Sequence, residues 1–172
     1  MSSKLTQKLT YSDFDHVAMV LTFVDDDDIY LLDATTEGVH IRSWSDIRKY
    51  KDECYSKIVW RKLYADRDDL FWEILQTFVE AVQGKKYKIT ISKLLKKKSI
   101  MPRLSQVLSG ENVVDDDRTF FCSELIAKAY KTLGFLISER SSAKFYPKHF
   151  SSKKDLQLTN AILGEELIIS NN

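Results

Sequence analysis

Residues 118–135 read RTFFCSELIAKAYKTLGF and predict a helix with one apolar face. The apolar residues recur at the three- and four-residue spacing of an α-helix, and Gly134 stands where helices commonly end. The residues on this face are Cys122, Leu125, Ile126, Ala129 and Leu133. Cys122 therefore lies at or just before the first turn of the predicted helix.

The position of Cys122 has two interpretations. Free N–H groups and the positive end of the helix dipole at a first turn favour a thiolate over a thiol. A nearby imidazole would favour the thiolate further and would serve as its base. The alternative is a structural cysteine, because free cysteine is among the most buried residue types and Cys122 lies on the apolar face. This residue alone leaves both interpretations open.

Upstream, three apolar and β-branched segments predict an antiparallel meander. The strands are His16–Val24 (HVAMVLTFV), Ile29–Ala34 (IYLLDA) and Val39–Ile41, the last after a break at Gly38. Four aspartates, Asp25–Asp28, separate the first two strands. An EF-hand loop needs spaced oxygen ligands, a glycine and a closing glutamate. This run lacks that pattern, so a solvated hairpin turn is favoured over a calcium site.

The predicted hairpin places His16 and Asp33 in a defined relation. Directly opposed residues of an antiparallel pair point to the same face, about 5 Å apart at Cβ. His16 and Asp33 share a face if His16 lies opposite Asp33 or opposite a residue two or four positions later, and a one-residue slip separates them. Asp33 is an acid within an apolar run, so we expect it to have a partner. A carboxylate beside an imidazole orients the ring, although His16 also fits a surface or capping histidine.

The remaining segments complete an α+β chain that we expect to form a single domain over residues 1–172. The clearest helix covers Asp66–Val82, with one apolar stripe, Asp66 as a candidate cap and Gly84 at its end. The other expected elements are a short helix at Ser43–Tyr50, strands at Tyr55–Leu63 and Tyr87–Ile91, a mobile surface excursion at Ser92–Asp117, and an aromatic tail, Phe145–Phe150, that docks on the body.

Composition excludes several classes of protein. The net charge of +1 lacks the strong basic excess of most nucleic-acid-binding domains. The two cysteines, Cys54 and Cys122, make neither a disulfide framework nor a metal-ligand pattern, so we expect a reducing cytoplasmic compartment and no metal or cofactor. No signal-peptide run and no stretch of about 18 apolar residues is present, so no transmembrane segment is expected. The basic cluster Lys96–Lys98 is read as a solvated loop rather than a membrane patch.

Four segments together resemble a known family. They are DHVAMVL (15–21), LLDATTEGVHI (31–41), GKKY (84–87) and FFCSELIAKAYKTLGF (120–135). The pattern is similar to the permuted members of the NlpC-type papain-like superfamily, and within it to the YiiX-like bacterial and poxvirus proteins. In these proteins a histidine opens a strand, an acidic residue follows in the next strand before a Gly-Val pair, and a cysteine at the head of a helix comes last. The resemblance covers roughly Asp13–Phe150.

The resemblance implies a fold and a chemistry. The fold would be a circularly permuted papain-like (NlpC-type) domain, an antiparallel sheet packed against helices, one of them headed by the catalytic cysteine. Cys122 matches the nucleophile, His16 the general base and Asp33 the orienting acid, whereas His40 and His149 match no catalytic position. The implied function is that of a cysteine hydrolase that cleaves an amide or ester through an acyl-enzyme. Peptides, amides and acyl-lipids are all substrates within the superfamily, which also contains lipid acyltransferases.

One departure from the family pattern keeps alternatives open. Family members usually begin with a strand of the type GDIILF, and residues 1–15 contain no such run. We therefore expect either a domain that lacks this strand or a piece of a longer protein. A catalytically inactive interaction domain with a protein partner is the second hypothesis. The third is an α+β domain in which Cys122, His16 and Asp33 never meet.

Overall fold

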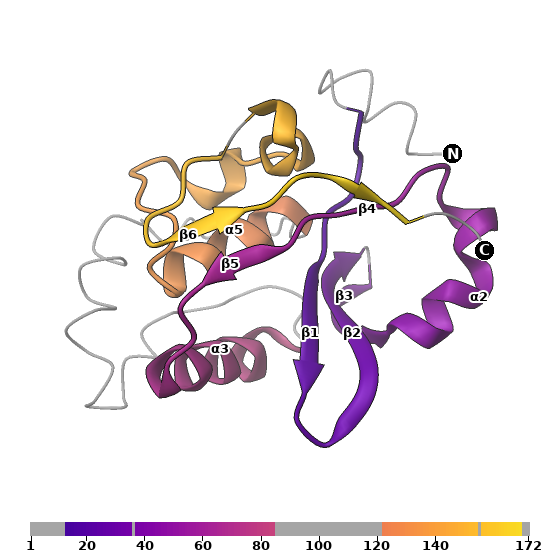
Figure 1. Ribbon diagram of the computed structural model, residues 1–172, viewed down its shortest axis with the longest axis horizontal. Coiled ribbons are helices and arrows are strands. Elements are labelled where there is room, and N and C mark those ends of the chain that lie inside the picture. Colours follow the sequence, from indigo (N-terminus) through magenta and orange to yellow (C-terminus); the bar gives the residue numbers. More distant parts are fainter. Residues whose placement is uncertain (1–12, 36, 85–121, 155, 170–172) are drawn as a thin grey trace.

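The computed structural model describes residues 13–35, 37–84, 122–154 and 156–169, and within them the fold is α+β. An antiparallel sheet of order β1-β2-β3 comprises β1 (Met19–Phe23), β2 (Asp26–Thr35) and β3 (Gly38–Ser43) (Figure 1). The predicted meander is therefore confirmed. Its bounds differ, because β1 begins at Met19 rather than at His16, and β2 begins inside the aspartate run.

The hairpin between β1 and β2 is tighter than the predicted four-residue turn. Phe23 pairs with Asp26, which leaves only two residues in the loop. The Asp26 carboxylate accepts the Asp28 backbone N–H at 2.9 Å and also accepts the Tyr30 hydroxyl. Tyr30 in turn packs edge-on against Phe23, with ring centroids 5.1 Å apart. These local bonds explain why aspartates that favour turns stand in a strand here.

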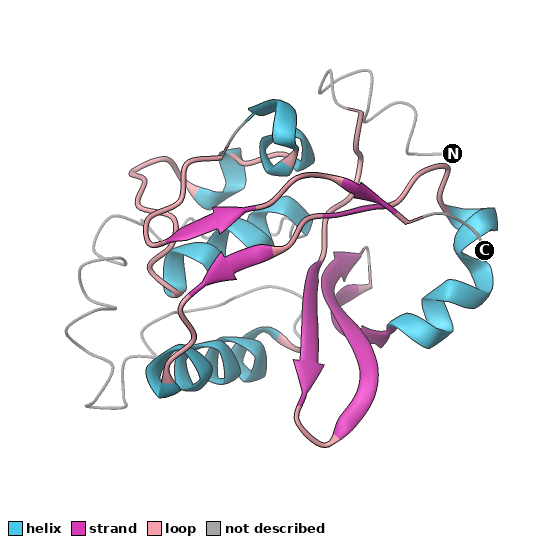
Figure 2. Ribbon diagram, in the orientation of Figure 1, coloured by secondary structure: helices cyan, strands magenta, loops and turns pink. Residues whose placement is uncertain are grey.

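The remaining elements are helices, 3₁₀ turns and short strands (Figure 2). The helices are α2 (Trp44–Cys54), α3 (Asp69–Val82) and α5 (Cys122–Thr132), with 3₁₀ turns η2 (Ser142–Lys144), η3 (Pro147–Phe150) and η4 (Ser152–Lys154). The short strands are β4 (Val59–Trp60), β5 (Leu63–Ala65), β6 (Ala161–Leu163) and β7 (Leu167–Ile168). The expected strand at residues 87–91 and the excursion at residues 92–117 lie outside the described residues.

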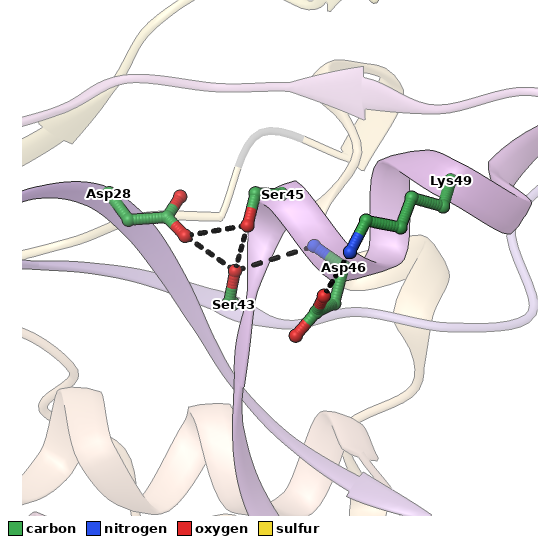
Figure 3. Close-up of polar contacts among 5 residues, drawn as sticks. All are labelled: Asp28, Ser43, Ser45, Asp46 and Lys49. Atoms are coloured by element: carbon green, nitrogen blue, oxygen red, sulfur yellow. Dashed lines mark hydrogen bonds and ion pairs between the residues drawn. The ribbon is translucent and has the colours of Figure 1, made fainter.

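A polar cluster fixes the start of α2 against the sheet (Figure 3). Ser43 is the N-cap, as its sequence position predicted, and its hydroxyl accepts the Asp46 backbone N–H at 3.4 Å. The Asp28 carboxylate of β2 accepts the hydroxyls of Ser43 and Ser45. Lys49 donates to Asp46 at 2.7 Å, one turn along the helix. The acidic run therefore serves in part to attach α2 to the sheet.

The start of α3 differs from the prediction by three residues. The helix begins at Asp69, and Asp68 rather than Asp66 is its N-cap. The Asp68 carboxylate accepts the Phe71 backbone N–H at 2.8 Å, the usual geometry of an N-cap. Three aspartates within four residues offered alternative caps, and only backbone geometry distinguishes them.

The predicted strand at Tyr55–Leu63 is wrong in its extent. Only Val59–Trp60 and Leu63 within that range are strand, and their partners β7 and β6 come from residues 161–168. The ladder is interrupted where Arg61 uses its guanidinium on three backbone carbonyls. It donates to Gly164 at 2.6 Å, Phe150 at 2.8 Å and Leu163 at 2.9 Å.

Because Arg61 ties together segments about a hundred residues apart in the sequence, its loss should destabilise the fold. Arg61→Ala is expected to lower the free energy of unfolding by about 2–3 kcal/mol, since three carbonyls lose a charged donor. Arg61→Lys should recover only part of this loss, because a point-like ammonium cannot match the fork of a guanidinium. Chemical denaturation of the three chains measures the effect. Equal stability of all three would show that solvent replaces the donor.

One apolar core joins the sheet, α3, α5 and the C-terminal segments. Its buried members are Leu21, Leu32, Ala34, Val39, Phe71, Phe78, Val82, Leu125, Ile126, Ala127, Ala129, Tyr130, Phe135, Leu136, Phe145, Phe150 and Ala161. The aromatic tail docks as predicted, with Phe145 and Phe150 buried. α5 was predicted to have one apolar face, but it is packed on several sides, because it contacts β2, α3 and η2. Gly134, at φ +76°, ends it in the left-handed conformation.

Candidate functional site

The site begins with the segment that precedes β1. Two surface contacts attach this segment to the body: the Asp13 carboxylate accepts from Lys153 at 2.5 Å, and the Lys57 ammonium lies 5.5 Å from the centre of the Phe14 ring. In β1 the register pairs Met19 with Leu32. Residues 16–18 precede the strand, so the strand register does not itself determine where the His16 side chain points.

The structure brings His16 and Asp33 together, one of the two outcomes that the hairpin pattern left open. The His16 Nε2 atom lies 3.2 Å from Asp33 Oδ2. This contact forms outside the strand ladder, because the β1–β2 pairing begins at Met19, three residues after His16. The expectation that an acid in an apolar run has a partner is therefore met.

Asp33 is a buried carboxylate with two positively charged neighbours. Its side chain is 1% exposed, and Oδ2 accepts from both His16 and Arg42. Burial alone would raise the pKa of Asp33, but the hydrogen bonds from His16 and Arg42 and their charges outweigh it. The pKa of Asp33 therefore lies below its ordinary value of 3.8, and the group is ionised at neutral pH.

The electrostatics of His16 favour the imidazolium. Burial alone would lower the pKa of His16, but hydrogen bonds to Asp33 and Cys122 and the negative charges of both groups raise it to about 10. Through the whole neutral range the ring therefore carries a proton on each nitrogen. With Nε2 directed at Asp33, Nδ1 is the nitrogen left for the Cys122 sulfur.

Cys122 is the first described residue of α5, and residues 118–121 of the predicted helix lie outside the described part of the chain. Its side chain is buried and hydrogen-bonds to His16. The adjacent Ser123 is fully buried, and its hydroxyl donates to the Phe145 carbonyl at 2.7 Å, which attaches the head of α5 to the aromatic tail. Cys54, the other free cysteine, is exposed at the end of α2. The three predicted residues thus form one connected series, Cys122 to His16 to Asp33.

Arg42 is the neighbour that sequence reasoning missed. It stands in β3 opposite Leu31, on the face that also carries Asp33. Its guanidinium donates through Nη2 to Asp33 Oδ2 and also bonds to Tyr55. Given the β2–β3 register, the pairing could have been predicted, because Arg42 and the buried Asp33 then share a face. That register was not available from the sequence.

His40 lies on the same face, directly opposite Asp33. Within the described residues, the buried side-chain polar atoms without a hydrogen-bond partner are Asp33 Oδ1, His40 Nε2 and Arg42 Nε. All three belong to this one face. The prediction that His40 has no catalytic role remains a prediction. His149 has a structural role in η3, where its Nδ1 accepts the Tyr146 backbone N–H at 2.8 Å.

The described residues contain no cluster of acidic, histidine and cysteine side chains suited to a metal ion. No helix in this part of the chain has the length and hydropathy of a membrane span. The GKKY segment beyond Gly84 and the basic cluster at residues 96–98 lie outside the described ranges.

Comparison of the chain with protein-family models, with curated proteins and with solved structures finds no match in any of the three.

Proposed function

We propose that the chain is a thiol hydrolase with Cys122 as nucleophile, His16 as general acid and base, and Asp33 as the residue that orients the ring. The observation that carries this proposal is the series of contacts from the head of α5 through an imidazolium to a buried, ionised carboxylate. A cysteine that only fills the core has no need of a charged imidazole. The permuted papain-like fold implied by the sequence resemblance belongs to the same proposal.

The proposed reaction has two steps. The Cys122 sulfur attacks a carbonyl carbon, a C–S bond forms, and the C–N or C–O bond breaks as His16 passes its Nδ1 proton to the leaving group. Water then attacks the thioester with His16 as base, which releases the acid and regenerates the thiolate and imidazolium. Asp33 keeps Nε2 protonated throughout, so that Nδ1 performs both transfers. The backbone N–H of Cys122, at the start of the described part of α5, is the candidate donor to the oxyanion.

Selective acylation of Cys122 tests the proposal. The chain is treated with p-nitrophenyl acetate near neutral pH, and the modified cysteines are located by peptide mass mapping. Accessibility alone favours Cys54, which is exposed, over Cys122, which is buried. We nevertheless expect Cys122 to be acetylated first and then to turn over, because the thiolate rather than the thiol is the nucleophile. Faster modification of Cys54, with no release of acetate from Cys122, would contradict the enzyme proposal.

A second candidate is a non-catalytic interaction domain. It is favoured by the outer face of the β4–β7 and β5–β6 pairs, where large apolar side chains are exposed: Trp60 38%, Tyr64 55%, Ile162 69% and Leu167 55%. A protein partner or the acyl chain of a lipid substrate would suit such a face. The same acylation experiment separates the two candidates, because a domain without a working site gives no turnover at Cys122.

The free Cys54 and Cys122 suit a reducing compartment such as the cytoplasm.

A further inference from the structure

Two cations share a single oxygen of Asp33. The Nε2 of His16 lies 3.2 Å from Asp33 Oδ2, and Nη2 of Arg42 donates to that same Oδ2. The other carboxylate oxygen, Oδ1, is buried and has no partner among the described residues. His16 and Arg42 therefore compete for Oδ2, although Oδ1 of the same carboxylate is also able to accept a hydrogen bond.

The sharing has an electrostatic consequence. Asp33 carries one negative charge, and that charge faces a permanent cation on Arg42 as well as the proton on His16. Two positive charges that bond to one oxygen lie close enough to repel each other in a partly buried site. Each cation thus weakens the hold of Asp33 on the other.

We propose that Arg42 is a positioning residue that shares the Asp33 carboxylate with His16 and so keeps the imidazolium able to release its proton. This inference rests on the proposed function, in which His16 must give up a proton to the leaving group and take one back from water. Asp33 with no second partner would turn more fully toward His16 and hold it as an imidazolium. Arg42 also fixes the carboxylate on the face of β2 that His16 reaches.

The titration of His16 also depends on the other titratable and charged groups near its ring, which the choice of variants removes or keeps constant. Cys122 approaches from α5 and Asp33 from β2, and His40 and Arg42 extend from β3 on the Asp33 side. A Cys122→Ala background removes the thiol, whose charge would otherwise titrate together with the ring. His40 is kept unchanged in every chain of the comparison.

The test is an NMR titration of the His16 ring in full-length Cys122→Ala chains that carry Arg42, Arg42→Lys or Arg42→Gln. The His16 signal is assigned by its disappearance in a His16→Gln chain. We expect the pKa of His16 to rise by about one unit with glutamine, because the competing positive charge is gone. Lysine keeps the charge but not the guanidinium fork, so a rise of about half that size is expected.

The outcomes are separable from the fate of the enzyme proposal, since the titration needs no turnover. An unchanged or lowered pKa of His16 in the Arg42→Gln chain would overturn the sharing of Asp33, whatever the acylation experiment shows. If the Arg42→Gln chain does not fold, the Arg42→Lys chain provides the test. A pKa of His16 in that chain equal to the pKa in the Arg42 chain would then contradict the proposal. In the active chain, the same ordering of the three variants is expected in the pH at which deacylation reaches half its maximal rate.

Discussion

Replacing His16 by alanine is expected to reduce ester hydrolysis by the chain about 10²- to 10⁴-fold, the usual contribution of a positioned acid–base group. It should also change how Cys122 reacts with iodoacetamide across the pH range. Because the pKa of His16 is raised to about 10, the imidazolium persists through neutral pH beside the Cys122 side chain. In the proposed pair this cation favours the thiolate, so we expect the alkylation rate of Cys122 to change little with pH across the neutral range.

In the His16→Ala chain an ordinary pH dependence should return. Alkylation should then rise steeply with pH, because no cation favours the thiolate over the thiol. The shape of the pH profile is the decisive measurement. A rate at a single pH depends both on the fraction of thiolate and on its nucleophilicity, and a thiolate paired with a cation is a weaker nucleophile. His149→Gln is the matched control, since this imidazole contacts Tyr146 and Arg140 instead. Identical profiles for the native and His16→Ala chains would rule out the pair.

Local sequence signals predicted the elements that position the site. The apolar spacing of residues 118–135, with Gly134 as its stop, placed Cys122 at the head of α5, and Ser43 marked the start of α2. Parity in the hairpin gave His16 and Asp33 a common face only in alternate registers, because a one-residue slip places them on opposite faces. The sequence therefore limited the possible registers without choosing one.

Other features depended on distant partners and were not predictable. β4 and β5 find their partners more than ninety residues later, in β7 and β6, and two- or three-residue strands carry almost no periodicity. The reach of Arg42 to Asp33 requires the β2–β3 register, which the sequence leaves free by one or two residues. His16 contacts Asp33 from outside β1, so the strand predicted to present it is not what holds it. Tertiary contacts at Asp13 and Phe14 do that instead.

Replacing Asp33 by asparagine is expected to lower the free energy of unfolding at neutral pH by about 2–4 kcal/mol. Removing one partner of a buried ion pair typically costs about 3–5 kcal/mol, and the loss is reduced here because His16 and Arg42 are 31% and 38% exposed and reach solvent. The amide also cannot neutralise either cation. Hydrolysis should fall together with stability, because the ring loses the anion that keeps Nε2 protonated.

The pH dependence of stability distinguishes this charge effect from a packing defect. The folded-state pKa of Asp33 lies below 3.8, so its stabilising contribution is present above about pH 4 and is lost as the pH falls through the folded value. The unfolding free energy of the Asp33→Asn chain should therefore fall less steeply below about pH 4 than that of the native chain. Asp28→Asn, the same substitution in the same strand, is the matched control. Asp28 also has a lowered pKa, but its hydroxyl partners Ser43 and Ser45 are uncharged and the residue is only half-buried. Equal losses at neutral pH for the two variants would mean that Asp33 acts as an ordinary polar residue, and the buried anion would then no longer explain the charge on His16.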